Sequence, residues 1–377
     1  MPTDHLKIGF VRRGFSGSGG AEAYLKRLAR GLVDAGHAGP QLFTTADWPA
    51  DEWPFGEVTR VSGSSPLQFA NELERLCARA SSDMLMSLER VWSCDVYRAG
   101  DGVHAAWLRR RARHATARQR LTSVFNRKHA AIIRLENSLF RDRRAARVIA
   151  NSRMVKREIT EFYGYPPELV DVVPNGVPVA EFRWNAEARD ASRHALSVKD
   201  EDVAVLFVGS GWERKGLVHA LHAVEKLDNR HLKLFVAGRG NQSRYKSEYI
   251  EFLGEVADVT ALYRASDIFV LPTLYDPFSN ACLEALASGM PVITTRSNGV
   301  AEVIDDGVHG TIIDTPNVGA VADAIMLWSD ADRRAAARPL IIERAAQFDI
   351  SINVERTLEI LLQAASAAST SSKIRNT

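Results

Sequence analysis

Two carboxylates eight positions apart, Asp276 and Glu284, occur in the stretch LYDPFSNACLEA at residues 274–285. A proline and several small or polar residues lie between them, as is typical of a helix start. Two acids in this arrangement could bind a metal ion, act as an acid/base pair, or hold two separate parts of one long polar ligand. They could also be an acid that complements the helix dipole and a surface glutamate, and neither would then need a ligand.

The residues around these acids predict their places in the fold. An apolar run precedes Asp276 and helical composition begins at Asn280, so we expect Asp276 in a loop and Glu284 on the helix. The backbone amides of Phe278, Ser279 and Asn280 would then form a helix start that can receive an anion or a polar ligand.

A second stretch, VLFVGSGWERKG at residues 205–216, places Arg214 and Lys215 after a glycine turn. It lacks the GK[ST] ending of a Walker phosphate loop. Two cations at a strand end can still clamp a diphosphate, Arg through its planar fork and Lys as a point charge. Ordinary solvated basic residues are the alternative. Because the dipole at a helix start disfavours cations, their position favours an anionic ligand.

The first half of the chain contains the glycine-rich stretch GFSGSGGAEAY at residues 14–24. It is similar to the GxGxxG dinucleotide fingerprint, but after Gly17 and Gly19 the third position is Glu22, so the fingerprint is incomplete. Glycines 17, 19 and 20 would still let backbone amides approach a phosphate group.

Further polar residues follow other apolar runs. Asp101 and His104 share a glycine-containing loop, where the histidine could be an active-site donor or a structural residue. Asn298, Gly299 and Glu302 fit a ligand loop or a plain turn equally well.

Two DxD strings, at residues 200–202 and 330–332, lie before a strand and in a polar helical region. We therefore expect them to be solvated acids, and we predict no metal site. The three cysteines, Cys77, Cys94 and Cys282, lack metal-ligand spacing and are predicted to be reduced, buried thiols.

Strands and helices alternate in two series along the chain. Strands are predicted within residues 6–15, 39–48, 83–89, 94–100, 146–152, 202–211, 232–240, 249–256, 267–273 and 290–297. Helices are predicted within residues 21–33, 67–80, 108–141, 217–227, 258–265 and 280–288. Such alternation predicts parallel sheets with ligand sites beyond the strand ends, and hence an α/β protein with two facing Rossmann-like domains.

A chain of 377 residues with 46% hydrophobic content is long enough for more than one core. The prolines and glycine of VPNGVP place the domain boundary near Pro174. We predict domains at 1–173 and 174–351, a helix at about 352–366 that could pack back on the first domain, and a disordered polar tail at 367–377.

The small net charge of +2 conceals a basic segment. Residues 108–147 contain thirteen Lys or Arg against Glu136 and Asp142, which gives +11 and leaves −9 for the rest. Apolar residues interleave with the cations, which favours an amphipathic element on an anionic membrane over a nucleic-acid arm. Alternatively, the cations could lie on a solvent-exposed helical face that binds no partner. No 18-residue apolar run and no leader pattern occur, so the expected compartment is the cytoplasm.

Taken together, these stretches resemble glycosyltransferase family 4, the retaining enzymes of the GT-B fold. The resemblance runs from GGAE at 19–22 and PNG at 174–176 to the Arg214–Lys215 pair and the E-x7-E motif, whose first acid is here Asp276. Within the family, CDVYRAGDGVHAAWLRRR and GSGWERKGL look most like bacterial lipopolysaccharide core glucosyltransferases.

The resemblance implies a role for each matching residue. Glu284 would hold the ribose of a nucleotide, and Arg239 would flank its base. Asp276 and the amides of residues 278–280 would bind the donor sugar. The diphosphate would be neutralised by Arg214 and Lys215, with Gly19 and Gly20 contributing across an interdomain cleft. Asp101 or His104 would orient donor sugar and acceptor, so that the implied catalytic set is Asp101, His104, Lys215 and Asp276.

The implied reaction is retaining, metal-independent transfer of a hexose, expected to be glucose, from a UDP-sugar. The acceptor would be a lipopolysaccharide core or similar glycolipid at the cytoplasmic membrane face. No cofactor and no nucleic-acid partner are expected. Two alternatives stay open: a nicotinamide-dependent dehydrogenase with Asp47 as its ribose-binding acid, and a non-catalytic sugar-binding protein.

Overall fold

The computed structural model describes residues 6–15, 20–37, 39–78, 81–114, 126–256 and 258–375. The chain divides into two compact units, Met1–Pro174 together with Asn353–Thr377 (unit 1) and Asn175–Ile352 (unit 2). Side chains beyond Ser366 lie outside the described part of the chain. The disordered tail predicted at 367–377 therefore stays a prediction, as does the cleft between the domains.

Unit 1 is built on a seven-stranded sheet within the described residues, and all of its pairings are parallel. The strand order is β3 (Val58–Arg60), β2 (Gln41–Thr44), β1 (Ile8–Val11), β4 (Met84–Ser87), β5 (Cys94–Ala99), β6 (Ala145–Ala150) and β7 (Val170–Val172). The order reverses at β1, as in a doubly wound fold.

Unit 2 carries a six-stranded parallel sheet within its described residues. Its order is β10 (Ile250–Gly254), β9 (Leu232–Ala237), β8 (Val203–Val208), β11 (Ile268–Leu271), β12 (Val292–Thr295) and β13 (Gly310–Ile313). The order reverses between β8 and β11, so their carboxyl ends form the topological switch point where ligands of such sheets bind.

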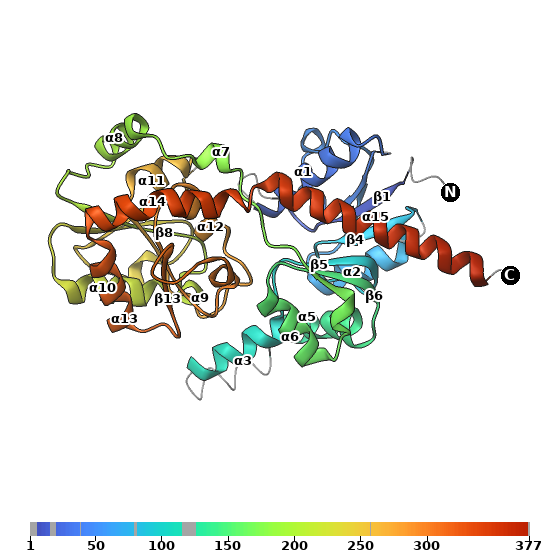
Figure 1. The fold of residues 1–377 in the computed structure, drawn as a ribbon. Coiled ribbons are helices and arrows are strands. Elements are labelled where there is room, and N and C mark those ends of the chain that lie inside the picture. Colours follow the sequence, from blue (N-terminus) through green and yellow to red (C-terminus); the bar gives the residue numbers. More distant parts are fainter. Residues whose placement is uncertain are drawn as a thin grey trace. The chain divides into compact units, whose positions relative to one another are not determined.

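Helices cover both sheets (Figure 1). In unit 1 they are α1 (Gly20–Asp34), α2 (Pro66–Arg75), α3 (His104–His114), α5 (Arg127–Glu136), the π-helical η4 (Asn137–Arg141) and α6 (Arg153–Tyr163). In unit 2 they are α7 (Val179–Phe182), α8 (Ala186–Ala195), α9 (Trp212–Lys215), α10 (Leu217–Leu227), α11 (Thr260–Ala265), α12 (Asn280–Ala287), α13 (Val318–Trp328) and α14 (Ala331–Ala346). Short 3-10 turns lie at Ala50–Glu52, Pro167–Leu169, Gln242–Arg244 and Gly299–Val303.

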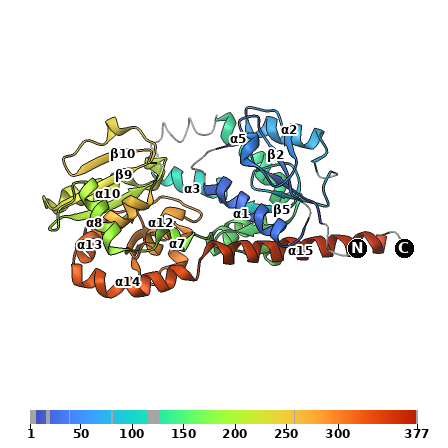
Figure 2. The ribbon, with the colours of Figure 1, turned by 90° about the horizontal axis from the view of Figure 1, so that it is seen from above.

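The last helix, α15 (Ile350–Arg375), lies beside α1 in both ribbon views (Figures 1 and 2). A hydrogen bond of 3.0 Å joins Tyr24 Oη on α1 to Thr357 Oγ1 on α15. At Gly31 a Cβ atom would lie 3.0 Å from a methyl group of Val354, so the two helices approach closely where α1 has no side chain.

Three of the expectations from the sequence are wrong in detail. The helix predicted over 108–141 is not continuous, because Asn126 has an extended backbone and caps the start of a new helix, α5. Asp202 of the first DxD string is buried and paired with Lys233, 2.9 Å away, rather than solvated. Cys77 is exposed, whereas Cys94 and Cys282 are buried as predicted.

Among the described helices, none combines the length and the apolar character needed to cross a bilayer.

Candidate functional site

The loops after β8 and β11 hold the polar residues that the sequence singled out in unit 2. Residues 209–216 follow β8, and residues 272–279 follow β11. The amide of Leu274 donates to the carbonyl of Arg214 at 2.9 Å, and the Thr273 hydroxyl donates to the same carbonyl at 3.0 Å. The two loops are therefore joined directly at the switch point of the sheet.

These loops bring Arg214, Lys215 and Asp276 together. Lys215 Nζ lies 3.4 Å from Asp276 Oδ2, and an Arg214 guanidinium nitrogen lies 3.9 Å from the same oxygen. The same nitrogen of Arg214 donates to the carbonyl of Tyr275 at 2.7 Å. The Asp276 side chain is only 9% exposed and that of Lys215 13%. Two cations facing one carboxylate leave an excess positive charge that can bind an anion.

Two glycines make this arrangement possible. Gly209 has φ +147°, and a Cβ there would lie 2.7 to 2.8 Å from the last carbons and Nζ of Lys215. Gly216 has φ +78°, and its Cβ would lie 2.0 Å from the carbonyl oxygen of Pro272. A side chain at either position would displace Lys215 or push the β8 loop off the β11 loop.

The start of α12 is fixed by Asn298. Its Oδ1 accepts the amide of Ser279 at 3.2 Å, and its Nδ2 donates to Thr294 Oγ1 at 3.0 Å. Ser279 in turn caps the helix by accepting the amide of Cys282. Asn298 is 1% exposed, so its side chain positions the loop rather than facing a ligand. The amide of Ser279, one of three predicted to face an anion, is already engaged by this side chain.

Asn175, the asparagine of the PNG stretch, also holds this helix start. Its Nδ2 donates to the carbonyl of Phe278 at 3.3 Å and to Asn280 Oδ1 at 2.7 Å. The Phe278 ring lies in the hydrophobic core, so only its backbone is placed to meet a ligand. PNG marked this position in the sequence, but nothing there indicated its contact with α12.

Glu284 lies on α12, one turn after the helix start. Its Oε2 accepts a hydrogen bond of 2.7 Å from the hydroxyl of Tyr263, a side chain that is buried on α11. Burial raises the pKa of Glu284, although the Tyr263 hydrogen bond and the charge of Lys215 act in the opposite direction. The carboxylate is thus oriented from one side by a fixed donor. No sequence signal identified Tyr263.

Arg239 lies in the loop after β9, the strand beside β8. Its backbone amide donates to Ser210 Oγ at 3.2 Å, which ties this loop to the one after β8. Its exposed side chain pairs with Glu255 at 3.1 Å. Arg239 therefore reaches the same edge of the sheet as the other residues of unit 2, with a side chain free to reorient in solvent.

In unit 1, Asp101 and His104 follow β5. Asp101 is 68% exposed and lies 3.7 Å from Arg90. The ring of His104 shares a 3.0 Å hydrogen bond with the ring of His129 on α5. Burial and the charge of Arg90 lower the pKa of His104 to about 4, so its imidazole is neutral at pH 7.

The loop around His104 is organised by Glu136, a residue that the sequence counted only as one acid in a basic segment. Glu136 is fully buried, and its carboxylate accepts four hydrogen bonds. The donors are the amides of His104 (2.7 Å) and Ala105 (3.3 Å), Arg90 Nε (2.9 Å) and Tyr163 Oη (2.6 Å). This carboxylate fixes the start of α3 and the side chain of Arg90 together.

Replacing Glu136 with glutamine is expected to lower the free energy of unfolding by about 3 kcal/mol, because a neutral amide leaves the buried Arg90 with only the exposed Asp101, 3.7 Å away, as a counter-charge. Urea denaturation followed by circular dichroism measures the change. Glu72→Gln, which breaks an exposed pair with Arg75, is the control and should leave the midpoint nearly unchanged. Equal midpoints for Glu136→Gln and wild type would contradict this role.

The glycine-rich stretch of unit 1 is only partly described. Gly19 lies outside the described residues, and Gly20 is the first residue of α1. Glu22 is buried and accepts two hydrogen bonds from Arg12, at 2.9 and 3.1 Å. Asp47, after β2, accepts the amide of Phe15 at 3.3 Å. These contacts give both acids local structural roles, which does not favour the ribose-binding role that a dehydrogenase would require of Asp47.

Two family models match the chain. One, described as Glycosyltransferase Family 4, matches residues 18–181, and the other, Glycosyl transferases group 1, matches residues 202–330. Together they cover most of both units.

Individual relatives agree with these matches. A probable transglycosylase of Burkholderia thailandensis is 28% identical over 377 aligned residues, which cover 96% of this chain and 98% of that protein. An uncharacterized glycosyltransferase of Methanocaldococcus jannaschii is 31% identical over 192 residues, 47% of this chain, and the chain spans only 49% of that relative's length.

Solved structures show the same fold. WaaG, a glycosyltransferase involved in lipopolysaccharide biosynthesis, superposes with a TM-score of 0.79 at 20% identity, over 94% of this chain and 99% of WaaG. HepE of Anabaena, solved in complex with UDP-glucose, superposes with a TM-score of 0.73 at 20% identity, over 95% of this chain and 99% of HepE. The prediction of a GT-B fold with two Rossmann-like domains is confirmed.

Proposed function

Because the chain belongs to the GT-B glycosyltransferases, with a Glycosyltransferase Family 4 domain followed by a group 1 domain, we propose that it is a retaining, UDP-sugar-dependent hexosyltransferase. The proposed donor is UDP-glucose, and the proposed acceptor is a lipopolysaccharide core or a similar glycolipid. The complex of HepE with UDP-glucose supports this class of donor, and the role of WaaG supports this class of acceptor.

One observation is the main support for the proposed donor-binding site. Arg214, Lys215 and Asp276 meet within 4 Å at the switch point of the unit 2 sheet, and Glu284 lies one helical turn beyond. In the proposed complex the two cations bind the diphosphate and Glu284 accepts hydrogen bonds from the ribose hydroxyls. Asp276 then contacts the sugar, aided by the backbone amides of Phe278 and Asn280. Arg239 flanks the base.

The proposed chemistry follows from this charge distribution. Cleavage of the bond between sugar and diphosphate develops negative charge on the leaving group, and Arg214 and Lys215 are fixed where they can stabilise it. We propose that these cations, rather than a metal ion or a cofactor, neutralise the diphosphate. The leaving phosphate takes the proton of the acceptor hydroxyl, so no protein nucleophile is needed. Asp101 and the neutral imidazole of His104 orient donor sugar and acceptor, and Gly19 and Gly20 contact the diphosphate.

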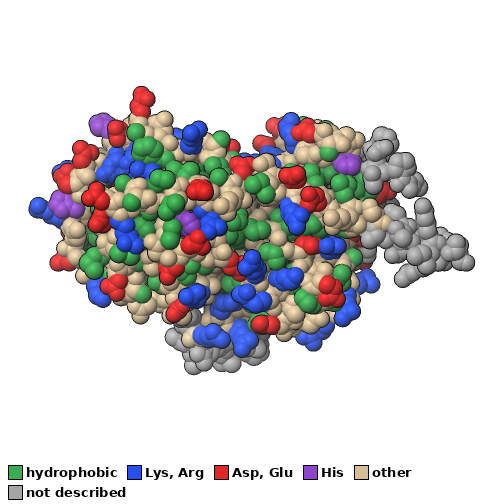
Figure 3. All heavy atoms as spheres, viewed as in Figure 1, with side chains coloured by type: hydrophobic (Ala, Val, Ile, Leu, Met, Phe, Trp, Pro, Cys, Tyr) green, Lys and Arg blue, Asp and Glu red, His purple; other side chains and the backbone are tan. Residues whose placement is uncertain are grey.

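The basic segment supports an acceptor at a membrane surface. Lys and Arg side chains gather on the face in Figure 3 where Figure 1 shows α3, α5 and α6. Each surface cation near an anionic bilayer contributes about 1 kcal/mol of attraction. We propose that residues 108–147 hold the protein on anionic lipid at the cytoplasmic face of the membrane, where a glycolipid acceptor would be presented.

A thermal-shift panel of UDP-, GDP- and ADP-sugars tests the donor. We expect UDP-glucose to raise the midpoint by several degrees and GDP- and ADP-glucose to have little effect, because a ligand that binds only the folded state stabilises it. Equal shifts for all three nucleotides, or none, would contradict the proposal.

Consumption of UDP-glucose only when acceptor is added separates a transferase from a sugar-binding protein. Titration of NADH fluorescence tests the dehydrogenase alternative.

A further inference from the structure

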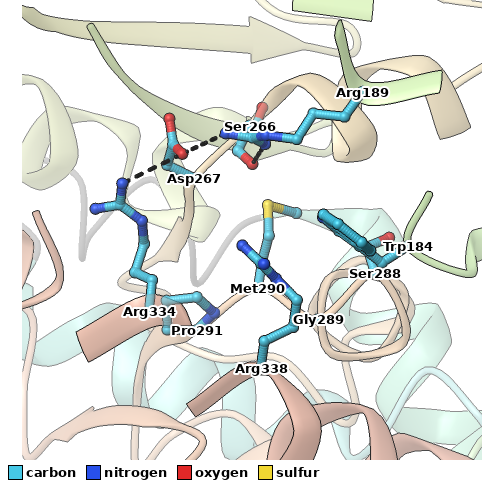
Figure 4. Close-up of a pocket in the computed structure, with 10 residues that line it drawn as sticks. All are labelled: Trp184, Arg189, Ser266, Asp267, Ser288, Gly289, Met290, Pro291, Arg334 and Arg338. Atoms are coloured by element: carbon cyan, nitrogen blue, oxygen red, sulfur yellow. Dashed lines mark hydrogen bonds and ion pairs between the residues drawn. The ribbon is translucent and has the colours of Figure 1, made fainter. Parts of the chain in front are cut away.

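A pocket in unit 2 opens at the opposite edge of the sheet from the candidate donor site. Asp267 immediately precedes β11, and Met290 and Pro291 immediately precede β12, so the pocket lies at the amino ends of these strands. The pocket is small and partly open to solvent. Figure 4 shows side chains from α14 and from the segment before α8 converging on it.

Positive charge dominates this pocket. Asp267 is buried and pairs with Arg189 at 2.6 Å, Arg193 at 3.0 Å and Arg334 at 3.4 Å. Arg338, one turn further along α14, lines the same pocket. Three guanidinium groups therefore pair with one carboxylate and a fourth lines the same pocket, which leaves an excess of three positive charges around it.

Two donors in the pocket lack a partner. The Arg338 guanidinium has no hydrogen bond or ion pair within the described residues; it lies over the Trp184 ring, 4.6 Å from its centre. The Trp184 Nε1 atom is buried and has no acceptor among the described residues. Burial and the charges of Arg189 and Arg334 lower the pKa of Arg338, which means that its charged form is destabilised there. The pocket therefore contains an unpartnered N–H donor beside a cation, and both could bind a hydrogen-bond acceptor.

We propose that this pocket binds a phosphate group, supplied either as inorganic phosphate or as a small sugar phosphate. The charged oxygens of a phosphate group accept hydrogen bonds, so they can bind Arg338, Arg334 and Trp184 Nε1. Their negative charge would also offset the excess positive charge of the pocket. The inference is independent of the proposed transferase function, because none of these residues belongs to the donor site.

Isothermal titration of inorganic phosphate into the full chain tests the site. We expect Arg338→Gln to weaken phosphate binding about tenfold or more, since it removes a charge-assisted contact. Lys215→Ala should retain the wild-type affinity, which separates this pocket from the donor site. Lys246→Gln removes one exposed charge elsewhere in unit 2 and should also retain it.

Several results would overturn the proposal. They are binding lost in Lys215→Ala but kept in Arg338→Gln, the same heat with chloride at matched ionic strength, or no binding to wild type. If Arg338→Gln does not fold by circular dichroism, Trp184→Phe replaces it; this variant keeps an aromatic ring, removes only the Nε1 donor, and should bind several-fold more weakly. A titration with glucose 6-phosphate identifies the source: tighter binding than inorganic phosphate indicates a sugar phosphate, and equal binding indicates free phosphate.

Discussion

Replacing Lys215 with alanine is expected to reduce the rate of sugar transfer by about 10²- to 10³-fold while the chain stays folded. Lys215 Nζ is held 3.4 Å from Asp276 and lies across Gly209, where no side chain intervenes. A cation fixed in this way stabilises charge that develops on the leaving diphosphate without first having to reorganise. Release of UDP from UDP-glucose in the presence of acceptor measures the effect.

The matched control for this variant is Lys246→Ala, which removes an exposed lysine of the same unit. Its rate should equal that of wild type, and both variants should melt near the wild-type temperature. A Lys215→Ala protein that turns over at the wild-type rate would remove the basis for the diphosphate site. A variant that has unfolded would not count, so Lys215→Met, which keeps the aliphatic length over Gly209, serves as the second test.

Replacing Glu284 with glutamine is expected to raise the KM for the UDP-sugar by about 10- to 100-fold, because hydrogen bonds to a charged acceptor contribute about 1.5–3 kcal/mol each. The ribose is proposed to donate to this carboxylate, and Tyr263 already occupies Oε2 at 2.7 Å. Glutamine keeps the shape of the side chain but replaces one acceptor oxygen by a donor. Initial-rate kinetics over a range of donor concentrations separate KM from kcat.

A control variant and a binding measurement accompany the Glu284→Gln experiment. Glu251→Gln, on the exposed side of the edge strand β10, should leave the KM unchanged. Free UDP should bind the Glu284→Gln variant more weakly by the same factor as the donor, since the lost contacts are to the ribose. If the KM for the UDP-sugar stays within twofold of the wild-type value, Glu284 does not bind the ribose, and the nucleotide binds at another place.

The sequence predicted the central strands better than the strands of three or four residues at the sheet edges. β8 and β11 are flanked on both sides in the sheet and are almost entirely buried, so they appear in the sequence as continuous apolar runs. β3, β7 and β13 are sheet-edge strands of three or four residues with partly exposed side chains, and they were not predicted. Their register depends on pairing with a neighbour rather than on their own composition.

The sequence predicted those residues of the candidate site that lie directly after the end of a strand. Arg214, Lys215 and Asp276 were found because polar residues directly after apolar runs gather at one edge of a parallel sheet, and in the structure they do. The contacts of Tyr263, Asn175 and Glu136 were missed because their partners lie 21, 105 and 32 positions away, respectively. No local pattern encodes a hydrogen bond between residues so far apart in the chain.

In the proposed complex, the loops after β8 and β11 bind the diphosphate of a nucleotide sugar while Glu284 binds its ribose. A crystal structure of the protein with UDP tests it most directly. We expect phosphate oxygens within hydrogen-bonding distance of Arg214 and Lys215, and both ribose hydroxyls at the Glu284 carboxylate. Ordered UDP that contacts none of these three side chains would contradict it.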